Sequence, residues 1–122
     1  MYLRLTLVFL ALLVATPTVA DAQDSRFSDA RFEITWRVRG SAPAFRFDGE
    51  VTNRQPIDVS DIVLAVESLD ATGRVTSTTV GFIDGPVSGN GSRTFSFRTS
   101  ITGDPKNLRL RPVSWQSSSR GQ

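Results

Sequence analysis

The chain has neither cysteine nor histidine among its 122 residues. Without them it holds no Ser-His-Asp or Cys-His catalytic group, and no zinc site with nitrogen or sulfur ligands. It also has no glycine-rich phosphate loop placed before a helix. A folded domain without disulfides has to be stable on packing alone. We therefore expect no catalytic residue, no cofactor-binding residue and no metal ligand.

Acidic residues are too sparse for a calcium loop. No loop has the dense acidic spacing of an EF-hand, although four aspartates lie in or beside the expected turns: Asp58, Asp61, Asp84 and Asp104. The charge does not indicate nucleic-acid binding either. The 14 basic residues are matched by 12 acidic ones, and the arginines alternate with acids where a nucleic-acid binder would have a basic stripe. We expect no nucleic-acid partner.

A long hydrophobic run is missing as well. The apolar stretch LTLVFLALLVA covers residues 5–15, which is shorter than the roughly 20 residues that a membrane-spanning helix needs. It follows Arg4 and is broken by Thr-Pro-Thr. Ala20 and Ala22 then place small residues at the −3 and −1 positions of a cleavage site. This order predicts a secretory signal peptide over residues 1–22, cleaved after Ala22, with Ala20 as the alternative. We expect a bacterial periplasmic or secreted protein with no transmembrane segment in its mature chain.

Cleavage after residue 22 leaves one domain, because a mature chain of 100 residues is large enough for a single core but not for two. Residues 23–30 are polar and are expected to form a flexible N-terminal segment. The domain itself is expected over residues 31–116. The serine-rich residues 117–122 are expected to form a disordered tail.

Strict alternation of apolar and polar residues predicts strands throughout this domain. The inward faces hold a large aromatic set: Phe32, Trp36, Phe45, Phe47, Phe95 and Phe97. No segment after residue 22 has a helical period of useful length. The fold class that follows is all-β: an Ig-like or fibronectin-III-like antiparallel β-sandwich of about six to seven strands, after an N-terminal signal peptide helix. Six strands are expected, at 31–39, 44–52, 61–69, 74–83, 94–101 and 108–116.

Three positions predict local detail. The continuous apolar run in 61–69 is typical of a central strand covered on both sides. At Pro112 the inward parity flips, which predicts either a bulge on an edge strand or a strand that crosses between the sheets. Gly49 takes an inward position, and close packing against Trp36 or Trp115 would explain it.

Two registers of a hairpin between the first two strands match their apolar residues. One pairs Trp36 with Phe47 and sets like charges opposite each other in two places. The other pairs Trp36 with Gly49 and sets Arg37 opposite Asp48. We favour the second register, because it avoids those like-charge oppositions and lets the indole cover the bare glycine.

The middle of the chain, about residues 44–101, resembles the FxLYD domains, a family of bacterial and archaeal extracytoplasmic Ig-like domains. GEVTN at 49–53 matches the family's Gly-x-Val-x-Asn pattern. DIVLAVESLDATGRV at 61–75 is similar to its central strand, with Asp70 in place, and TFSF at 94–97 stands where the family has a strand after its loop. The resemblance implies a non-catalytic accessory or binding module and supplies no catalytic residue.

Asp48 and Glu50 form a tight carboxylate pair, and they suggest a hydrolase as a remote alternative. On a strand they share a face about 7 Å apart, within the range that glycosidases use. A general acid needs a raised pKa, and therefore an apolar pocket. Their face of the strand instead holds arginine and threonine side chains, which favours an exposed ionic surface.

Outward-facing arginines form the candidate interaction face of a sheet built from the strands at 31–39, 44–52 and 94–101. They are Arg37, Arg39, Arg46 and Arg98. We expect an exported, non-catalytic Ig-like module that mediates protein–protein interaction with an unknown envelope protein. The alternative is binding of an anionic polysaccharide or lipid headgroup on this face.

Overall fold

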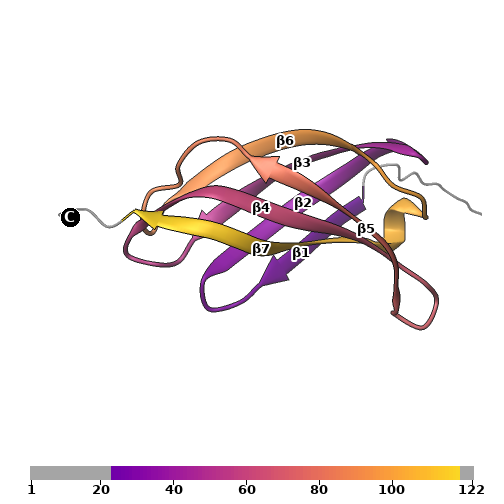
Figure 1. Cartoon of the computed structure of the whole chain (residues 1–122), viewed down its shortest axis with the longest axis horizontal. Helices are drawn as coiled ribbons and strands as arrows, with labels where there is room; N and C mark the ends of the chain where they lie inside the picture. Colours follow the sequence, from indigo (N-terminus) through magenta and orange to yellow (C-terminus); the bar gives the residue numbers. More distant parts are fainter. Residues whose placement is uncertain (1–22, 119–122) are drawn as a thin grey trace, which may run out of the picture.

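The computed structural model describes residues 23–118, which form two layers of antiparallel strands (Figure 1). The predicted signal peptide, and the helix expected within it, lie outside the described residues. Among residues 23–118, no helix is long and apolar enough to cross a membrane. Seven strands and one short 3₁₀ helix follow each other along the chain: β1 (Gln23–Ser28), β2 (Phe32–Ser41), β3 (Ala44–Asn53), β4 (Asp58–Leu69), β5 (Val75–Ile83), β6 (Ser92–Ser100), η2 (Pro105–Asn107) and β7 (Leu108–Ser118).

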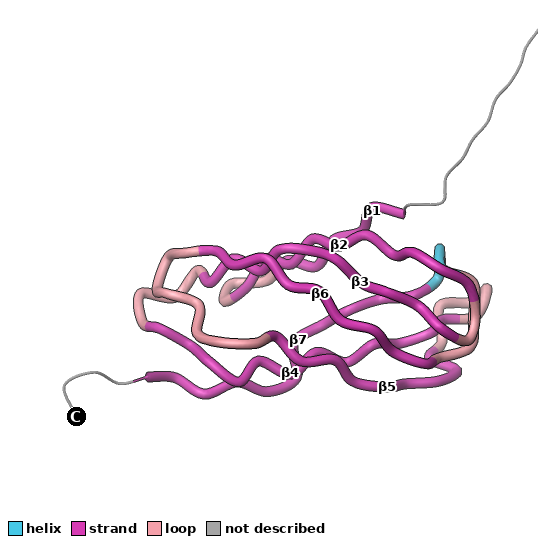
Figure 2. The backbone as a smooth tube through the Cα atoms, turned by 90° about the horizontal axis from the view of Figure 1, so that it is seen from above, coloured by secondary structure: helices cyan, strands magenta, loops and turns pink. Residues whose placement is uncertain are grey.

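The strands divide into a four-stranded sheet of order β1-β2-β3-β6 and a three-stranded sheet of order β5-β4-β7. Figure 2 shows the two sheets as separate layers, one above the other. The predicted class, an all-β sandwich, is therefore confirmed, and all six predicted strands are present. β4 is the central strand of its sheet, as its apolar run predicts.

The connections follow the Ig-like pattern of strand neighbours. β3 pairs with β2 and β6, and β4 pairs with β5 and β7. β2, β3 and β6 thus have the order of strands A, B and E in immunoglobulin-type domains, and β5, β4 and β7 have the order of strands C′, C and F. In those domains a strand G pairs with the outer edge of F. Among residues 23–118, no strand pairs with the corresponding edge of β7.

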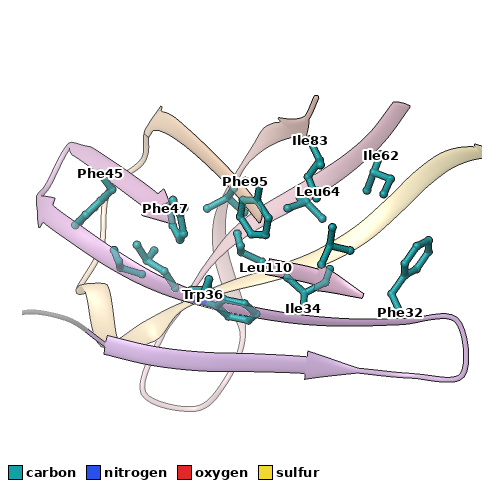
Figure 3. Close-up of a cluster of buried hydrophobic side chains, with 14 of the residues drawn as sticks. Phe32, Ile34, Trp36, Phe45, Phe47, Ile62, Leu64, Ile83, Phe95 and Leu110 are labelled. Atoms are coloured by element: carbon teal, nitrogen blue, oxygen red, sulfur yellow. The ribbon is translucent and has the colours of Figure 1, made fainter. Parts of the chain in front are cut away.

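Side chains from both sheets meet in one hydrophobic core (Figure 3). The four-stranded sheet contributes mainly aromatic residues, and the three-stranded sheet contributes aliphatic ones. Because rings and branched chains fill such a layer without voids, packing holds the sandwich together without a disulfide. The largest fully buried members are Phe32, Phe45, Phe47, Ile34, Ile62, Leu64 and Leu110.

The chain has a bulge at Pro112, which was one of the two predicted explanations for the change of parity. The register between β4 and β7 passes from Leu64 opposite Pro112 to Val63 opposite Ser114. Val113 is therefore the extra residue, and it is exposed. The shift turns Trp115 inward, where its ring packs edge-on against Phe32 with 4.9 Å between the centroids.

Two expectations about the chain ends are corrected. Residues 23–28 were expected to be flexible, yet they form β1, which pairs along its whole length with β2. Phe27 lies opposite Ile34 and packs against the core, so this single apolar side chain gives the polar segment a reason to stay ordered. At the other end β7 continues through Ser118, and residues 119–122 of the predicted tail lie outside the described residues.

The favoured register of the β2–β3 hairpin is confirmed: Trp36 lies opposite Gly49 and Arg37 opposite Asp48. The side chain that covers the glycine is a different one, however. A Cβ at Gly49 would overlap the Thr35 carbonyl oxygen and lie 2.7 Å from Cζ of Phe95 on β6. The glycine thus gives a phenylalanine ring of the neighbouring strand room to lie against the backbone.

Candidate functional site

The outward face of the four-stranded sheet holds the predicted arginines. Antiparallel register sets Arg39 of β2 directly opposite Arg46 of β3, and Arg46 directly opposite Arg98 of β6. We call these three residues the arginine row. Their side chains are exposed. Since neighbouring strands lie about 4.8 Å apart, the row presents three guanidinium groups across a short span of surface.

The arginine row lines an open hollow of about 580 Å³. Its other lining residues come from the adjoining ends of the same three strands: Gly40, Ala44, Phe45, Thr99 and Ser100. None of these brings a carboxylate into the hollow. Like charges directly opposite each other on neighbouring strands are destabilising, so the row costs the fold some stability unless negative charge lies close to it.

Asp48 supplies that negative charge from one side of the row. Nε of Arg46 donates a hydrogen bond to its Oδ1 at 3.0 Å, and Nε of Arg39 lies 3.5 Å from Oδ2. Ser96 Oγ donates to the same Oδ1 at 2.7 Å. The hydrogen bond from Ser96 is the main cause that lowers the pKa of Asp48; burial opposes it, and Arg46 and Arg39 lower the pKa further. Within the described residues, Arg98 has no ion pair.

Arg37 occupies the next row, opposite Asp48. It lines a second open hollow of about 600 Å³ on the same sheet, together with Arg26, Thr35 and Glu50. The sheet therefore brings three of the four predicted arginines into one row and places the fourth beside them. The charged side chains that line the hollow at the arginine row are all positive. The hollow at Arg37 is lined by both positive and negative side chains.

The far end of the same face is electrically balanced. Glu33 pairs with Arg26 at 2.6 Å and with Arg54 at 3.0 Å. An ordinary exposed surface is expected to mix both signs in this way. The excess of positive charge is therefore local to the arginine row.

The carboxylate pair does not have the geometry of an acid catalyst. Asp48 is held by Ser96 and Arg46, and its pKa is lowered where a general acid needs a raised one. Glu50 is exposed and lies opposite Thr35 and Thr94. The arrangement suits Asp48 to the positioning of arginine side chains.

A buried carboxylate covered by two partly exposed arginines on the other sheet was missed by the sequence reasoning. Glu67 of β4 is 4% exposed, and it accepts hydrogen bonds on Oε1 from Arg109 and on Oε2 from Arg111. We call these three residues the Glu67 clamp. A sequence signal for it existed, because Glu67 is an acidic residue next to an apolar run and two arginines stand at alternate positions of β7.

Asn53, which closes the Gly-x-Val-x-Asn pattern, is fully buried. Its Nδ2 donates to the carbonyl oxygen of Ile57 at 2.7 Å and more weakly to those of Val87 and Ser88, while its Oδ1 accepts from the Gln55 amide. The side chain joins the loop after β3 to the loop between β5 and β6, which also share a backbone hydrogen bond from Asn90 N–H to the Gln55 carbonyl oxygen. Its position in the pattern is therefore explained by structure, without any ligand.

The four aspartates considered for calcium do not assemble. Among residues 23–118, no group of three or more acidic side chains is placed to hold a metal ion. Two of the four accept hydrogen bonds from backbone amides. Asp58 accepts from the N–H of Gly89, and Asp104 caps the 3₁₀ helix by accepting from the N–H of Lys106.

Comparison with protein-family models, with curated proteins and with solved structures found no match for the chain.

Proposed function

We propose that the chain is an exported, non-catalytic binding module of the bacterial envelope, and that the arginine row binds an anionic ligand. The observation behind this proposal is the register that sets Arg39, Arg46 and Arg98 opposite one another in an open hollow. Phosphate, sulfate and carboxylate groups all have the charge and the acceptor oxygens that guanidinium groups bind. An anionic polysaccharide and a lipid headgroup are the two sources of such groups.

Electrostatics favours a ligand here over a purely structural role. Three arginines in one row repel one another, and among residues 23–118 only Asp48 forms ion pairs with the row, with Arg39 and Arg46. An anion lying across the row would relieve that repulsion and would meet Arg98, which has no ion pair among the described residues. The net charge of +2 is small, so binding depends on these local contacts more than on long-range attraction.

Export is the part of the proposal that rests on the N-terminal pattern. The pattern consists of Arg4, the apolar run of residues 5–15 and the small residues before Gln23, and it supports a periplasmic or secreted location. All of these residues lie outside the part of the chain that the structure describes. The FxLYD resemblance supports the same assignment to an extracytoplasmic, non-catalytic domain.

Interaction with another envelope protein is the second candidate. It is supported by apolar side chains on the outward face of the three-stranded sheet, where Phe82 is 61% exposed, Val80 47% and Val113 44%. Scattered exposed apolar residues are ordinary, but a contiguous group on one sheet is a feature of protein-binding surfaces. In register, Phe82 and Val80 are neighbours of Val63 and Ala65 on β4.

Binding to two anionic probes would test the primary candidate. We expect the purified protein to bind polygalacturonate, or phosphatidylcholine vesicles that contain phosphatidylglycerol, with affinity that falls steeply as ionic strength rises from about 10 mM to 1 M. The substitutions Arg39→Gln and Arg98→Gln should each weaken binding about fivefold, for ~1 kcal/mol per contact. The probe that binds identifies whether the source is a polysaccharide or a lipid.

Lys106→Gln is the matched control, because it removes one exposed positive charge on the 3₁₀ helix. It should leave binding unchanged within about a factor of two, because Lys106 does not line the hollow at the arginine row. Equal losses from all three substitutions, or binding that is indifferent to salt, would contradict a site at the arginine row.

A further inference from the structure

β5 differs from the other edge strands of the described chain. Both sheets end in edges, and an edge strand presents unpaired backbone N–H and C=O groups to any extended segment nearby. Charged residues or proline usually protect such an edge. β5, with the sequence VTSTTVGFI, has neither. The other edge strands hold charged residues, and β7 also holds a proline: Arg26 in β1, Arg93 and Arg98 in β6, and Arg109, Arg111 and Pro112 in β7.

The side chains of β5 suit a strand added beside it. The strand is rich in threonine and valine, which favour pleated structure. Its outward residues Val80 and Phe82 are largely exposed. A strand paired along the free side of β5 would bring its own side chains next to both of them, so that backbone pairing and apolar burial would act together.

We propose that a second copy of this chain pairs antiparallel with β5 about a two-fold axis at Thr79, the middle residue of the strand. This register opposes the whole of β5 to itself. It also brings Arg74, which precedes the strand, within about one position of the partner's Asp84, which follows it, because the register irregularity at Thr76 lies between them. The symmetry repeats the contact. Arg74 and Asp84 are exposed, and neither has an ion pair among the described residues. Opposite charges directly across an antiparallel pair are favourable.

Charge is the reason to choose a second copy as the occupant. A charged segment from a different protein would find no opposite charge along nine residues of β5. A copy of β5 brings no charge inside the pairing and one complementary pair at each end. The register of β5 with β4 skips Thr76. The proposed pairing of β5 with its copy is therefore regular from Ser77 to Gly81, and it passes Thr76 before it reaches the flanking charges.

Such a dimer has a definite architecture. An antiparallel edge pairing joins the two three-stranded sheets into one continuous sheet, with the two-fold axis perpendicular to it. The two four-stranded sheets then lie on the same side of the dimer. The contact is one strand pair wide, so it falls at the small end of specific interfaces and should be weak and concentration-dependent.

Sedimentation velocity over a concentration series would test the proposal without any ligand. We expect a reversible monomer–dimer equilibrium for the purified protein. Val80→Lys should abolish the dimer, because it places two positive charges beside the axis on the free edge. Arg74→Asp and Asp84→Arg should each weaken dimerisation about tenfold, and the double variant with both substitutions should restore it, because the two charges are only exchanged.

Lys106→Asp is the control for Arg74→Asp, since it changes the net charge equally at an exposed position outside β5. It should leave the dimer intact. Far-UV circular dichroism of each variant monitors the fold, and the double variant excludes a folding defect as the cause of a loss. A monomer at every concentration, or a double variant no better than the single ones, would overturn the proposal. An edge that bound only a segment of a different protein would give the first of these results.

Discussion

Glu67 combines near-complete burial with a charge, and so it shows at the scale of one residue how this small domain uses ionic groups. Burial alone would raise its pKa, but the hydrogen bonds from Arg111 and Arg109 outweigh burial and lower it from the usual value of 4.5. A buried carboxylate is tolerated only when its oxygens are satisfied. Here each oxygen accepts from two nitrogens of one guanidinium group.

The Glu67 clamp predicts a specific dependence of stability on pH. A group with a lowered pKa stabilises the fold above its unfolded pKa, near 4.5, and loses that contribution as the pH falls through the folded pKa. We expect Glu67→Gln to lower the free energy of unfolding by about 1–2 kcal/mol at pH 7. The difference from the unmodified protein should shrink as the pH falls below 4.5. Urea unfolding at a series of pH values measures it.

Glu50→Gln serves as the comparison, because it removes the same charge from an exposed position on β3. Its effect should stay within about 0.5 kcal/mol at pH 7. A Glu67→Gln effect that was constant from neutral to acidic pH would mean that the clamp contributes through packing alone.

β3 shows at the scale of an element how tightly the four-stranded sheet is specified. It is flanked on both sides by strands whose side chains and backbone approach Gly49 closely. No side chain fits there, because the Thr35 carbonyl oxygen and the Phe95 ring already occupy the space. The pairing of β3 with both neighbours therefore depends on one residue without a side chain.

Gly49→Ala should lower the free energy of unfolding by about 1–3 kcal/mol, because the added methyl group forces either backbone or ring to move. Glu50→Ala, the next residue along β3, is exposed and should cost less than about 0.5 kcal/mol. Urea unfolding monitored by circular dichroism separates the two. Equal effects would show that the sheet adjusts to a side chain at position 49 at no particular cost.

Much of this element-level structure could be predicted from the sequence. The alternation of Phe32, Ile34 and Trp36 with polar residues defines β2, and the inward glycine opposite Trp36 selects the register of β2 with β3. These signals are local and periodic, so they can be recognised in the sequence without knowledge of the fold. β1 could not be predicted in the same way, because a polar segment with one phenylalanine has no period.

The candidate sites depend on information that the sequence does not display. The favoured register already implied that Arg39 faces Arg46, a like-charge contact that the sequence reasoning did not note. Arg98 completes the row only through the register of β3 with β6, which joins residues far apart in the chain. The Glu67 clamp depends on the pairing of β4 with β7, and the register of this pairing shifts at two places. Pairing between distant strands is set by the whole fold.

At the scale of the whole molecule, the two proposals concern opposite layers of the sandwich. The arginine row lies on the four-stranded sheet, and the free edge of β5 belongs to the three-stranded sheet. A dimer formed along β5 would present two arginine rows on one side. Two linked sites bind a polymer or a surface more strongly than either site alone, without any new contact.

A long anionic polymer should therefore distinguish the monomer from the dimer. We expect Val80→Lys to weaken binding to polygalacturonate about tenfold or more, while binding to monomeric galacturonate stays unchanged, because only the polymer can engage two rows. Isothermal titration calorimetry with both ligands measures this. If polymer and monosaccharide lost affinity equally, the change at Val80 would act on the arginine row itself.

The strand order also has a consequence for how the chain reaches this structure. Hairpins between β2 and β3 and between β4 and β5 involve neighbours in sequence, whereas β3 with β6 and β4 with β7 close much longer loops. Asp48 and Ser96 are 48 residues apart, and Glu67 and Arg109 are 42 apart. Contacts of such separation slow folding, typically to milliseconds or seconds in sandwiches. Asp48 and Glu67 both bridge strand pairings of this long separation, so we expect their hydrogen bonds to form after the local hairpins.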